Sequence, residues 1–156
     1  MLEIVSDTPH ETERIGSLAG EMLKNGDVVA LSGELGTGKT TLIKGIAQGI
    51  GFDSGEVVSP SFTFINEYDG PLPLFHIDLY RLENEKELYE IGYEEYMQGD
   101  GVVVIEWADK VPHAVPEESL WITLRYLDAE RREIIVTARG ARYEKIIEHL
   151  RKKLYT

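Results

Sequence analysis

The sequence predicts an α/β protein, a three-layer fold built on a mixed parallel and antiparallel sheet. Residues 33–40 read G-E-L-G-T-G-K-T and match the phosphate-binding pattern G-x-x-x-x-G-K-[ST] at every fixed position. A short apolar run at 27–32 precedes this motif, and apolar side chains at helical spacing follow it at 41–47. A second continuous apolar run, at 101–106, is typical of a central buried strand. Together these runs indicate a sheet with a glycine-rich loop between one strand and the next helix.

The loop motif predicts a nucleotide site and, with it, a P-loop NTPase-like fold. Its glycines allow backbone angles closed to other residues, so that successive N–H groups can converge on phosphate oxygens. The N-terminus of the following helix adds the positive end of a dipole. Lys39 is expected to reach the β- and γ-phosphates, and the Thr40 hydroxyl to bind Mg²⁺. The predicted nucleotide-binding residues of the motif are Gly33, Gly36, Thr37, Gly38, Lys39, Thr40 and Thr41.

Length and composition limit the domain number, the partners and the location of the protein. At 156 residues, the chain is expected to form one domain spanning 1–156. With 28 acidic and 16 basic residues its net charge is −12, which argues against a direct grip on nucleic acid and favours a basic protein partner. There is no 18-residue apolar run and no signal-peptide pattern, so no membrane association is expected. The absence of cysteine excludes disulfides and is compatible with a cytoplasmic location.

The N-terminal segment predicts a strand and a capped helix. Residues 1–5 alternate well enough for a short strand. Thr8 as the N-cap, Pro9 at the first helical position and Glu11 two residues later form a capping-box pattern. The apolar stripe of the first helix extends to Leu23, and the helix is expected to close at residues 25–26.

The rest of the chain alternates between strand and helix patterns. Asp69-Gly70 is a hairpin signal between two strands rich in β-branched and aromatic residues. In chain order, the predicted elements are a loop at 51–60, strands at 62–68 and 74–78, a helical segment at 83–90, a second short helix or a turn at 91–97, a strand at 101–106, a loop at 107–118, strands at 120–127 and 133–138, and a helix at 141–154.

Two carboxylates end predicted strands and are candidates for a catalytic centre. Glu106 follows the apolar run at 102–105, and Asp78 ends the strand at 74–78. Ligands of open α/β sheets bind outside the carboxyl ends of the strands, where one acid can bind Mg²⁺ and another can orient the attacking water. The alternative is that each acid only caps the segment that follows it.

A hydroxyl-rich segment at 59–63 reads S-P-S-F-T and lies where switch loops occur in nucleotide hydrolases. Its composition alone indicates only a turn. However, this segment, H-I-D-L-Y-R-L at 76–82 and V-I-E-W at 104–107 follow the phosphate loop in the order and spacing of the TsaE (YjeE) family. The chain resembles that family of small bacterial P-loop ATPases of the tRNA threonylcarbamoyladenosine pathway over nearly its whole length.

The resemblance implies roles at matching positions. Asp78, Glu106 and Thr63 would be catalytic, and Thr40, Glu106 and Asp78 would form the metal shell. Trp107 would lie beside the site, either as a reporter of nucleotide or partner or simply as a core or rim residue. Arg132 is a candidate nucleotide contact from the strand pair.

The implied activity is Mg²⁺-dependent binding and hydrolysis of ATP, with ADP as product, in a complex with TsaD and TsaB that brings the chain to tRNA only indirectly. A small-molecule kinase is the first alternative, but no arginine-bearing lid is apparent between Trp107 and Glu118. A GTPase is disfavoured because no Asn-Lys-x-Asp segment occurs. A nucleotide-binding protein without useful hydrolysis remains the third alternative.

Overall fold

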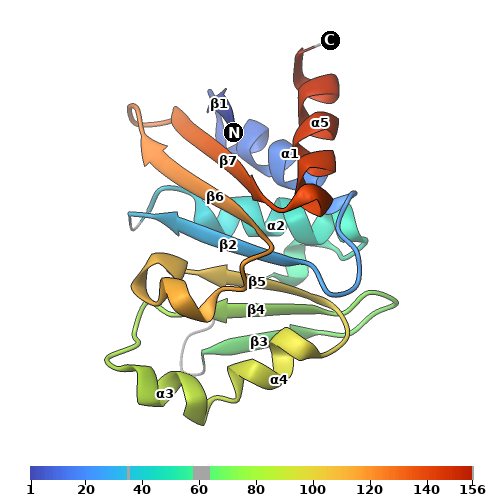
Figure 1. The fold of residues 1–156 in the computed structure, drawn as a ribbon. Coiled ribbons are helices and arrows are strands. Elements are labelled where there is room, and N and C mark those ends of the chain that lie inside the picture. Colours follow the sequence, from blue (N-terminus) through green and yellow to red (C-terminus); the bar gives the residue numbers. More distant parts are fainter. Residues whose placement is uncertain (35, 58–63, 156) are drawn as a thin grey trace.

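The computed structural model describes residues 1–34, 36–57 and 64–155, arranged in three layers with a sheet in the middle (Figure 1). Within these residues seven strands form one sheet, in the order β1-β7-β6-β2-β5-β4-β3. The strands are β1 (Leu2–Ser6), β2 (Val28–Gly33), β3 (Ile65–Tyr68), β4 (Leu74–Asp78), β5 (Val102–Glu106), β6 (Ser119–Tyr126) and β7 (Arg132–Arg139).

The sheet has a parallel centre and antiparallel margins. Strand β2 lies between β6 and β5 and is parallel to both, and β4 is parallel to β5. Strands β7, β1 and β3 run antiparallel to the strands with which they pair. The predicted mixed sheet is therefore confirmed, and the carboxyl ends of four adjacent strands meet at one edge, where ligands of such sheets bind.

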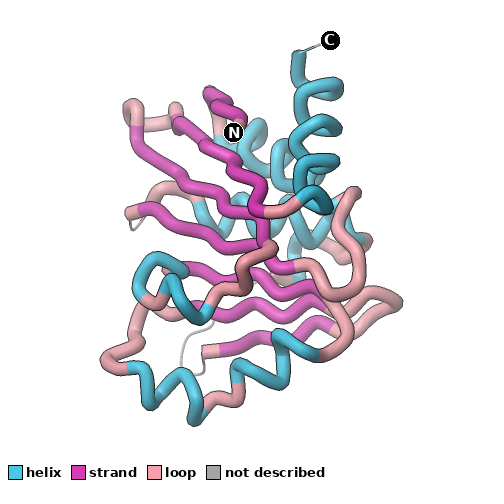
Figure 2. The backbone as a smooth tube through the Cα atoms, in the orientation of Figure 1, coloured by secondary structure: helices cyan, strands magenta, loops and turns pink. Residues whose placement is uncertain are grey.

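Helices cover both faces of the sheet (Figure 2). One face packs against α1 (Pro9–Gly20), α2 (Lys39–Ile50) and α5 (Ala141–Tyr155). The other packs against α3 (Glu85–Glu90), α4 (Tyr93–Gln98) and the short 3₁₀ helices η2 (Ala108–Lys110) and η3 (Pro112–Ala114). Another 3₁₀ helix, η1 (Ser54–Glu56), follows α2.

Strand β5 is buried on both faces, as the continuous apolar run predicts. Val102 and Val104 belong to the core under α1 and α2, while Val103 and Ile105 belong to the core under the helices of the other face. Because successive strand side chains point to opposite faces, only a strand covered on both sides needs an uninterrupted apolar sequence.

Helices α1 and α2 approach so closely that their backbones touch. A Cβ atom built on Gly45 would lie 2.0 Å from the carbonyl oxygen of Glu13, and one on Gly16 would lie 2.3 Å from that of Leu42. Only a residue without a side chain fits at such positions. This glycine contact fixes α2, and the loop at its N-terminus, against α1.

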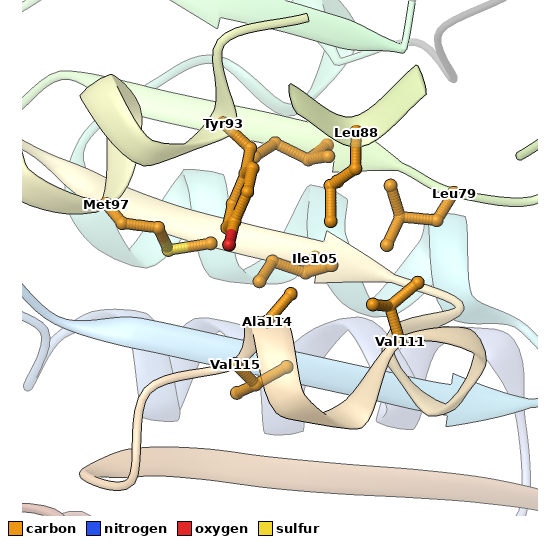
Figure 3. A pocket seen from close by; sticks show the side chains of 9 residues that line it. Leu79, Leu88, Tyr93, Met97, Ile105, Val111, Ala114 and Val115 are labelled. Atoms are coloured by element: carbon orange, nitrogen blue, oxygen red, sulfur yellow. The ribbon is translucent and has the colours of Figure 1, made fainter. Parts of the chain in front are cut away.

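On the other face, a small apolar cavity lies between the sheet and α3, α4 and η3 (Figure 3). Its volume of about 10 Å³ leaves room for no more than one water, which would find almost no polar partner there. The lining residues are Ile77, Leu79, Leu88, Tyr93, Met97, Ile105, Val111, Ala114 and Val115. We therefore regard this cavity as a packing void of the second core.

The first helix departs from its predicted form at both ends. Thr8 is the N-cap, since its hydroxyl accepts a hydrogen bond from the Glu11 N–H at 3.1 Å, but the Glu11 carboxylate accepts from the Asp7 N–H rather than from Thr8, so the capping box is incomplete. The helix ends at Gly20, earlier than predicted. Beyond Gly20 the bonding pattern changes to i→i−3 turns, in which the Met22 N–H donates to the Ala19 carbonyl at 3.1 Å and the Leu23 N–H to the Gly20 carbonyl at 3.2 Å. The Gly26 N–H then donates to the Gly101 carbonyl at 2.8 Å just before β2.

Smaller differences follow in later segments. The predicted loop at 107–118 contains the two 3₁₀ helices η2 and η3, and the loop at 51–60 contains η1. The strand predicted at 62–68 is seen as Ile65–Tyr68, and residues 62 and 63 lie outside the described part of the chain. No helix in the described residues is long and apolar enough to cross a membrane.

The two ends of the chain lie next to each other. Strand β1 pairs with β7, so that Leu2 lies opposite Val136 and Ser6 opposite Arg132. From α5, the Tyr155 hydroxyl donates to the Glu3 carbonyl at 3.3 Å. The N-terminal strand is therefore held by the last quarter of the sequence.

Candidate nucleotide-binding site

The loop between β2 and α2 has the geometry that its glycines predict. Gly36 and Gly38 have φ angles of 80° and 98°, in the left-handed region that favours glycine, and Gly38 is the N-cap of α2. Thr37 tightens the loop by donating its hydroxyl to the Glu34 carbonyl at 2.7 Å. Thr40 and Thr41 lie in the first turn of α2, next to Lys39. The loop thus brings the motif residues together at a helix N-terminus, as expected for an anion site.

The Lys39 side chain folds back onto the phosphate loop. Its ammonium group donates to the Gly33 carbonyl at 2.6 Å and to the Glu34 carbonyl at 2.7 Å. It also lies 4.1 Å from the centre of the Trp107 ring, which forms a cation–π contact. Burial lowers the pKa of Lys39, while the negative charges of Glu106 and Asp78 act in the opposite direction. Among the described residues, the printed partners of this ammonium are two carbonyls and a ring, and no carboxylate lies within ion-pair distance, so the group is available to a stronger anionic partner.

The two predicted acids lie side by side at the strand ends. Asp78 and Glu106 are paired residues of the parallel strands β4 and β5, and Glu106 is buried. Burial, then the charge of Glu106, raises the pKa of the Asp78 carboxyl. The Asp78 Oδ1 atom accepts from the Tyr80 N–H at 3.0 Å, which fixes its orientation. Two carboxylates so placed repel each other until a proton or a cation is shared between them.

His76 is a member of the site that the residue patterns did not assign. Its Nε2 atom lies 2.7 Å from Oε2 of Glu106, and its side chain is fully buried. The signal was present in the spacing: His76 and Asp78 are two residues apart in one strand and so share a face. What the pattern lacked was the register that sets this face against Glu106.

The donor set fits Mg²⁺. Mg²⁺ prefers oxygen ligands and is usually held by one or two carboxylates together with substrate phosphates and water. Glu106 and Asp78 offer such a carboxylate pair, with mutual repulsion that a divalent cation would relieve, and Thr40 offers a hydroxyl at the start of α2. Across the described ranges, no group of three or more His, Asp or Glu side chains is placed to hold a metal. A cation here would accordingly depend on phosphate oxygens to complete its shell.

Arg132 lies beside the loop and is anchored to it. Its Nε atom donates to the Thr37 carbonyl at 3.1 Å, and its Nη1 atom donates to the Asp128 carbonyl at 2.9 Å. Its guanidinium lies 4.5 Å from the centre of the Tyr126 ring. These contacts tie the β6–β7 turn to the phosphate loop. A contact with nucleotide stays a prediction.

Trp107 lies beside the site and is partly buried, while its role as a reporter of nucleotide or partner stays a prediction. Its ring packs on Tyr80, with centroids 5.2 Å apart, and against the second core, yet it also covers Lys39. It has a φ of 60°, which is unusual for a residue with a side chain. In this left-handed conformation the ring lies over the Lys39 ammonium.

A cleft of about 480 Å³ opens next to the loop. Its lining includes Ser32 of β2 and Thr123 of β6, whose hydroxyl oxygens lie 2.8 Å apart. Its other lining residues are Gly33, Glu34, Trp107, Asp109, Leu124, Arg125 and Tyr126. Thr63 and the rest of the predicted switch segment at 59–63 lie outside the described residues, so their relation to this cleft is not described.

The sheet order, the loop between β2 and α2, and the acids at the ends of β4 and β5 define a protein of the P-loop NTPase-like α/β class. Residues 6–134 match the family model described as "Threonylcarbamoyl adenosine biosynthesis protein TsaE". The chain belongs to the TsaE family, as its motifs predict.

Relatives of this family are similar to the chain over most of its length. The chain is 46% identical over 143 residues to "tRNA threonylcarbamoyladenosine biosynthesis protein TsaE" of Bacillus subtilis (strain 168), covering 91% of this chain and 89% of that protein. It is 42% identical over 135 residues to the protein of the same description from Treponema pallidum (strain Nichols), covering 86% and 99%. The crystal structure of YdiB from Bacillus subtilis superposes with a TM-score of 0.79 at 39% identity, covering 97% of this chain and 95% of that one.

Proposed function

We propose that this chain is the Mg²⁺-dependent ATP-binding and ATP-hydrolysing component of tRNA threonylcarbamoyladenosine synthesis, acting in the cytoplasm with TsaD and TsaB. The family description supports the pathway. One observation carries the activity: the Lys39 ammonium is held within the loop by two carbonyls, close to the acid pair at the ends of β4 and β5.

Binding of a triphosphate would exchange the partners of Lys39. The ammonium leaves the carbonyls of Gly33 and Glu34 for phosphate oxygens, and the N–H groups of the loop and of the α2 N-terminus donate to the same anion. Charge-assisted hydrogen bonds to phosphate are stronger than those to neutral carbonyls, so the exchange is favourable.

Glu106 and Asp78 would have different roles in hydrolysis. Glu106, buried and hydrogen-bonded to His76, would hold Mg²⁺, which supplies charge neutralisation at the phosphates. Asp78, whose carboxyl is oriented by the Tyr80 N–H, would orient the attacking water or complete the metal shell. The raised pKa of Asp78 is consistent with a group that accepts a proton more readily than an exposed aspartate.

The first test compares two lysines of the same helix. Lys39→Ala removes the cation of the loop, whereas Lys44→Ala removes the same charge from α2 five residues further on. Calorimetry with ATP and Mg²⁺ should show a loss of affinity of about 10-fold or more for Lys39→Ala, because bonds to a charged group are lost. Lys44→Ala should bind like wild type. Equal affinity and turnover in all three proteins would refute the site.

The second test concerns partners. Arg132 already donates to carbonyls of the loop and the β6–β7 turn, so the cation that the described loop clearly supplies is Lys39. An added cationic group accelerates related phosphoryl transfers by about 10³-fold or more. Phosphate release by the isolated chain should be slow and should rise when TsaB and TsaD are added. A fast rate that partners do not change would favour an independent enzyme such as a small-molecule kinase.

A further inference from the structure

The buried contact between His76 and Glu106 has a chemistry of its own. His76 lies on β4 opposite Val104 of β5, two register positions away from the Asp78–Glu106 pair. Its side chain has no exposed surface, and the Nε2 to Oε2 distance of 2.7 Å is that of a strong hydrogen bond. Its other nitrogen, Nδ1, is buried and has no hydrogen-bond partner in the described structure.

The geometry makes the Nε2 atom of His76 the donor. A carboxylate oxygen can only accept, so the hydrogen shared by the two side chains is the one on Nε2. Nδ1 has no partner in the described structure, so Nε2 is the atom through which the buried ring acts on its neighbour.

This hydrogen bond constrains the Glu106 carboxylate. It fixes the rotamer of the side chain and occupies Oε2, as outer hydrogen-bond partners of metal ligands typically do.

We infer that His76 is a positioning residue that holds the Glu106 carboxylate, through its Nε2–H, in the orientation that binds the Mg²⁺ of the nucleotide complex. This inference rests on the proposed function, since it assigns a supporting residue to that same site. Outer partners of metal ligands typically contribute about 10-fold to 100-fold in metal affinity.

Two substitutions of almost equal size separate hydrogen bonding from packing. In His76→Gln, the amide nitrogen stands four bonds from Cα, as Nε2 does, and remains a donor. In His76→Met, a methyl group occupies that place and donates nothing. The readout is the gain in ADP affinity produced by Mg²⁺, measured by calorimetry with and without the metal, so that turnover is not needed.

We expect His76→Met to lose about 10-fold of this gain and His76→Gln to stay within about threefold of wild type. ADP affinity without Mg²⁺ should be the same in all three proteins. In a Glu106→Gln background, His76→Met should cause no further loss, because the carboxylate it serves is gone. If His76→Met fails to fold, His76→Asn replaces it, since its amide nitrogen is one bond too short to reach Glu106.

The outcomes distinguish the two hypotheses. If wild type binds ADP and gains nothing from Mg²⁺, or does not bind ADP, the proposed function fails. If wild type shows the gain and His76→Met keeps it in full, or if His76→Gln loses as much as His76→Met, the positioning role is wrong while the nucleotide site stands.

Discussion

A single methyl group added to Gly45 tests how the phosphate loop is supported. On sequence alone, Gly45→Ala in the middle of α2 should stabilise the helix by about 1 kcal/mol, because alanine is the better helix former. The structure predicts the opposite. The new Cβ would lie 2.0 Å from the Glu13 carbonyl oxygen, whereas such contacts are essentially never shorter than 3.0 Å. Both groups belong to helix backbones, so neither can simply rotate away.

Helices α1 and α2 must therefore separate at this point. Relieving the contact from 2.0 to 3.0 Å or more disturbs the core on both sides of it, and overpacking of this kind costs about 1–3 kcal/mol beyond any gain in propensity. We expect a net loss of about 2 kcal/mol in the free energy of unfolding. In a domain of this size, that loss lowers Tm by about 4–8 °C.

The assay is urea and thermal unfolding followed by circular dichroism. The control is Gly55→Ala in η1, where the nearest atom to the added Cβ is Asp53 Oδ1 at 3.5 Å, an ordinary contact. The free energy of unfolding of Gly55→Ala should stay within about 0.5 kcal/mol of the wild-type value. ADP affinity should also fall in Gly45→Ala, since the loop begins α2. If the unfolding midpoint of Gly45→Ala equals or exceeds that of wild type, the close packing of α1 and α2 does not require a glycine at position 45.

Three further predictions concern the site and its surroundings. Glu106→Gln should retain ADP binding but lose the effect of Mg²⁺, whereas Asp78→Asn should mainly slow hydrolysis; two variants that hydrolyse ATP at the wild-type rate with partners present would show that neither acid acts. Hydrogen bonds from Arg131 lower the pKa of Asp128 to about 2, from 3.8, so its contribution to stability is present above pH 4 and is lost as the pH falls through 2. Asp128→Asn, which mimics the protonated acid, should accordingly be less stable than wild type in urea at pH 6 and equal to it near pH 2; a constant difference would contradict the assignment. Binding to TsaB and TsaD, measured by light scattering, should weaken as salt rises, given the net charge of −12; a salt-independent affinity would exclude charge as the attraction.

The elements that could be predicted are those whose signal is local. The motif at 33–40 places Lys39 at the start of a helix whatever the rest of the chain does, because glycine torsions and helix capping are short-range. The uninterrupted apolar run at 102–105 predicts the buried strand β5. Glu106 and Asp78 were placed correctly because parallel strands end at a common edge.

What could not be predicted depends on pairs far apart in sequence. The contact of His76 with Glu106 spans 30 residues and needs the register of β4 on β5. The contact of Gly45 with Glu13 requires the packing of two helices, whereas the sequence shows only a poor helix former. Arg132 reaches Thr37 across 95 residues, and no periodicity encodes such a bond.

The placement of β1 has a consequence for how the chain folds during synthesis. Its partner, β7, begins at Arg132, so the first strand made is among the last to be paired. Residues 2–6 stay unpaired until most of the chain has left the ribosome, and the ladder then closes across about 130 residues of intervening chain. A truncation that removes β7 and α5 leaves β1 without its hydrogen-bonding partner, although the phosphate loop lies within the first third of the sequence. Nascent chains stopped before residue 132 lack the strand that pairs with both β1 and β6, and unpaired strand edges of this kind favour aggregation.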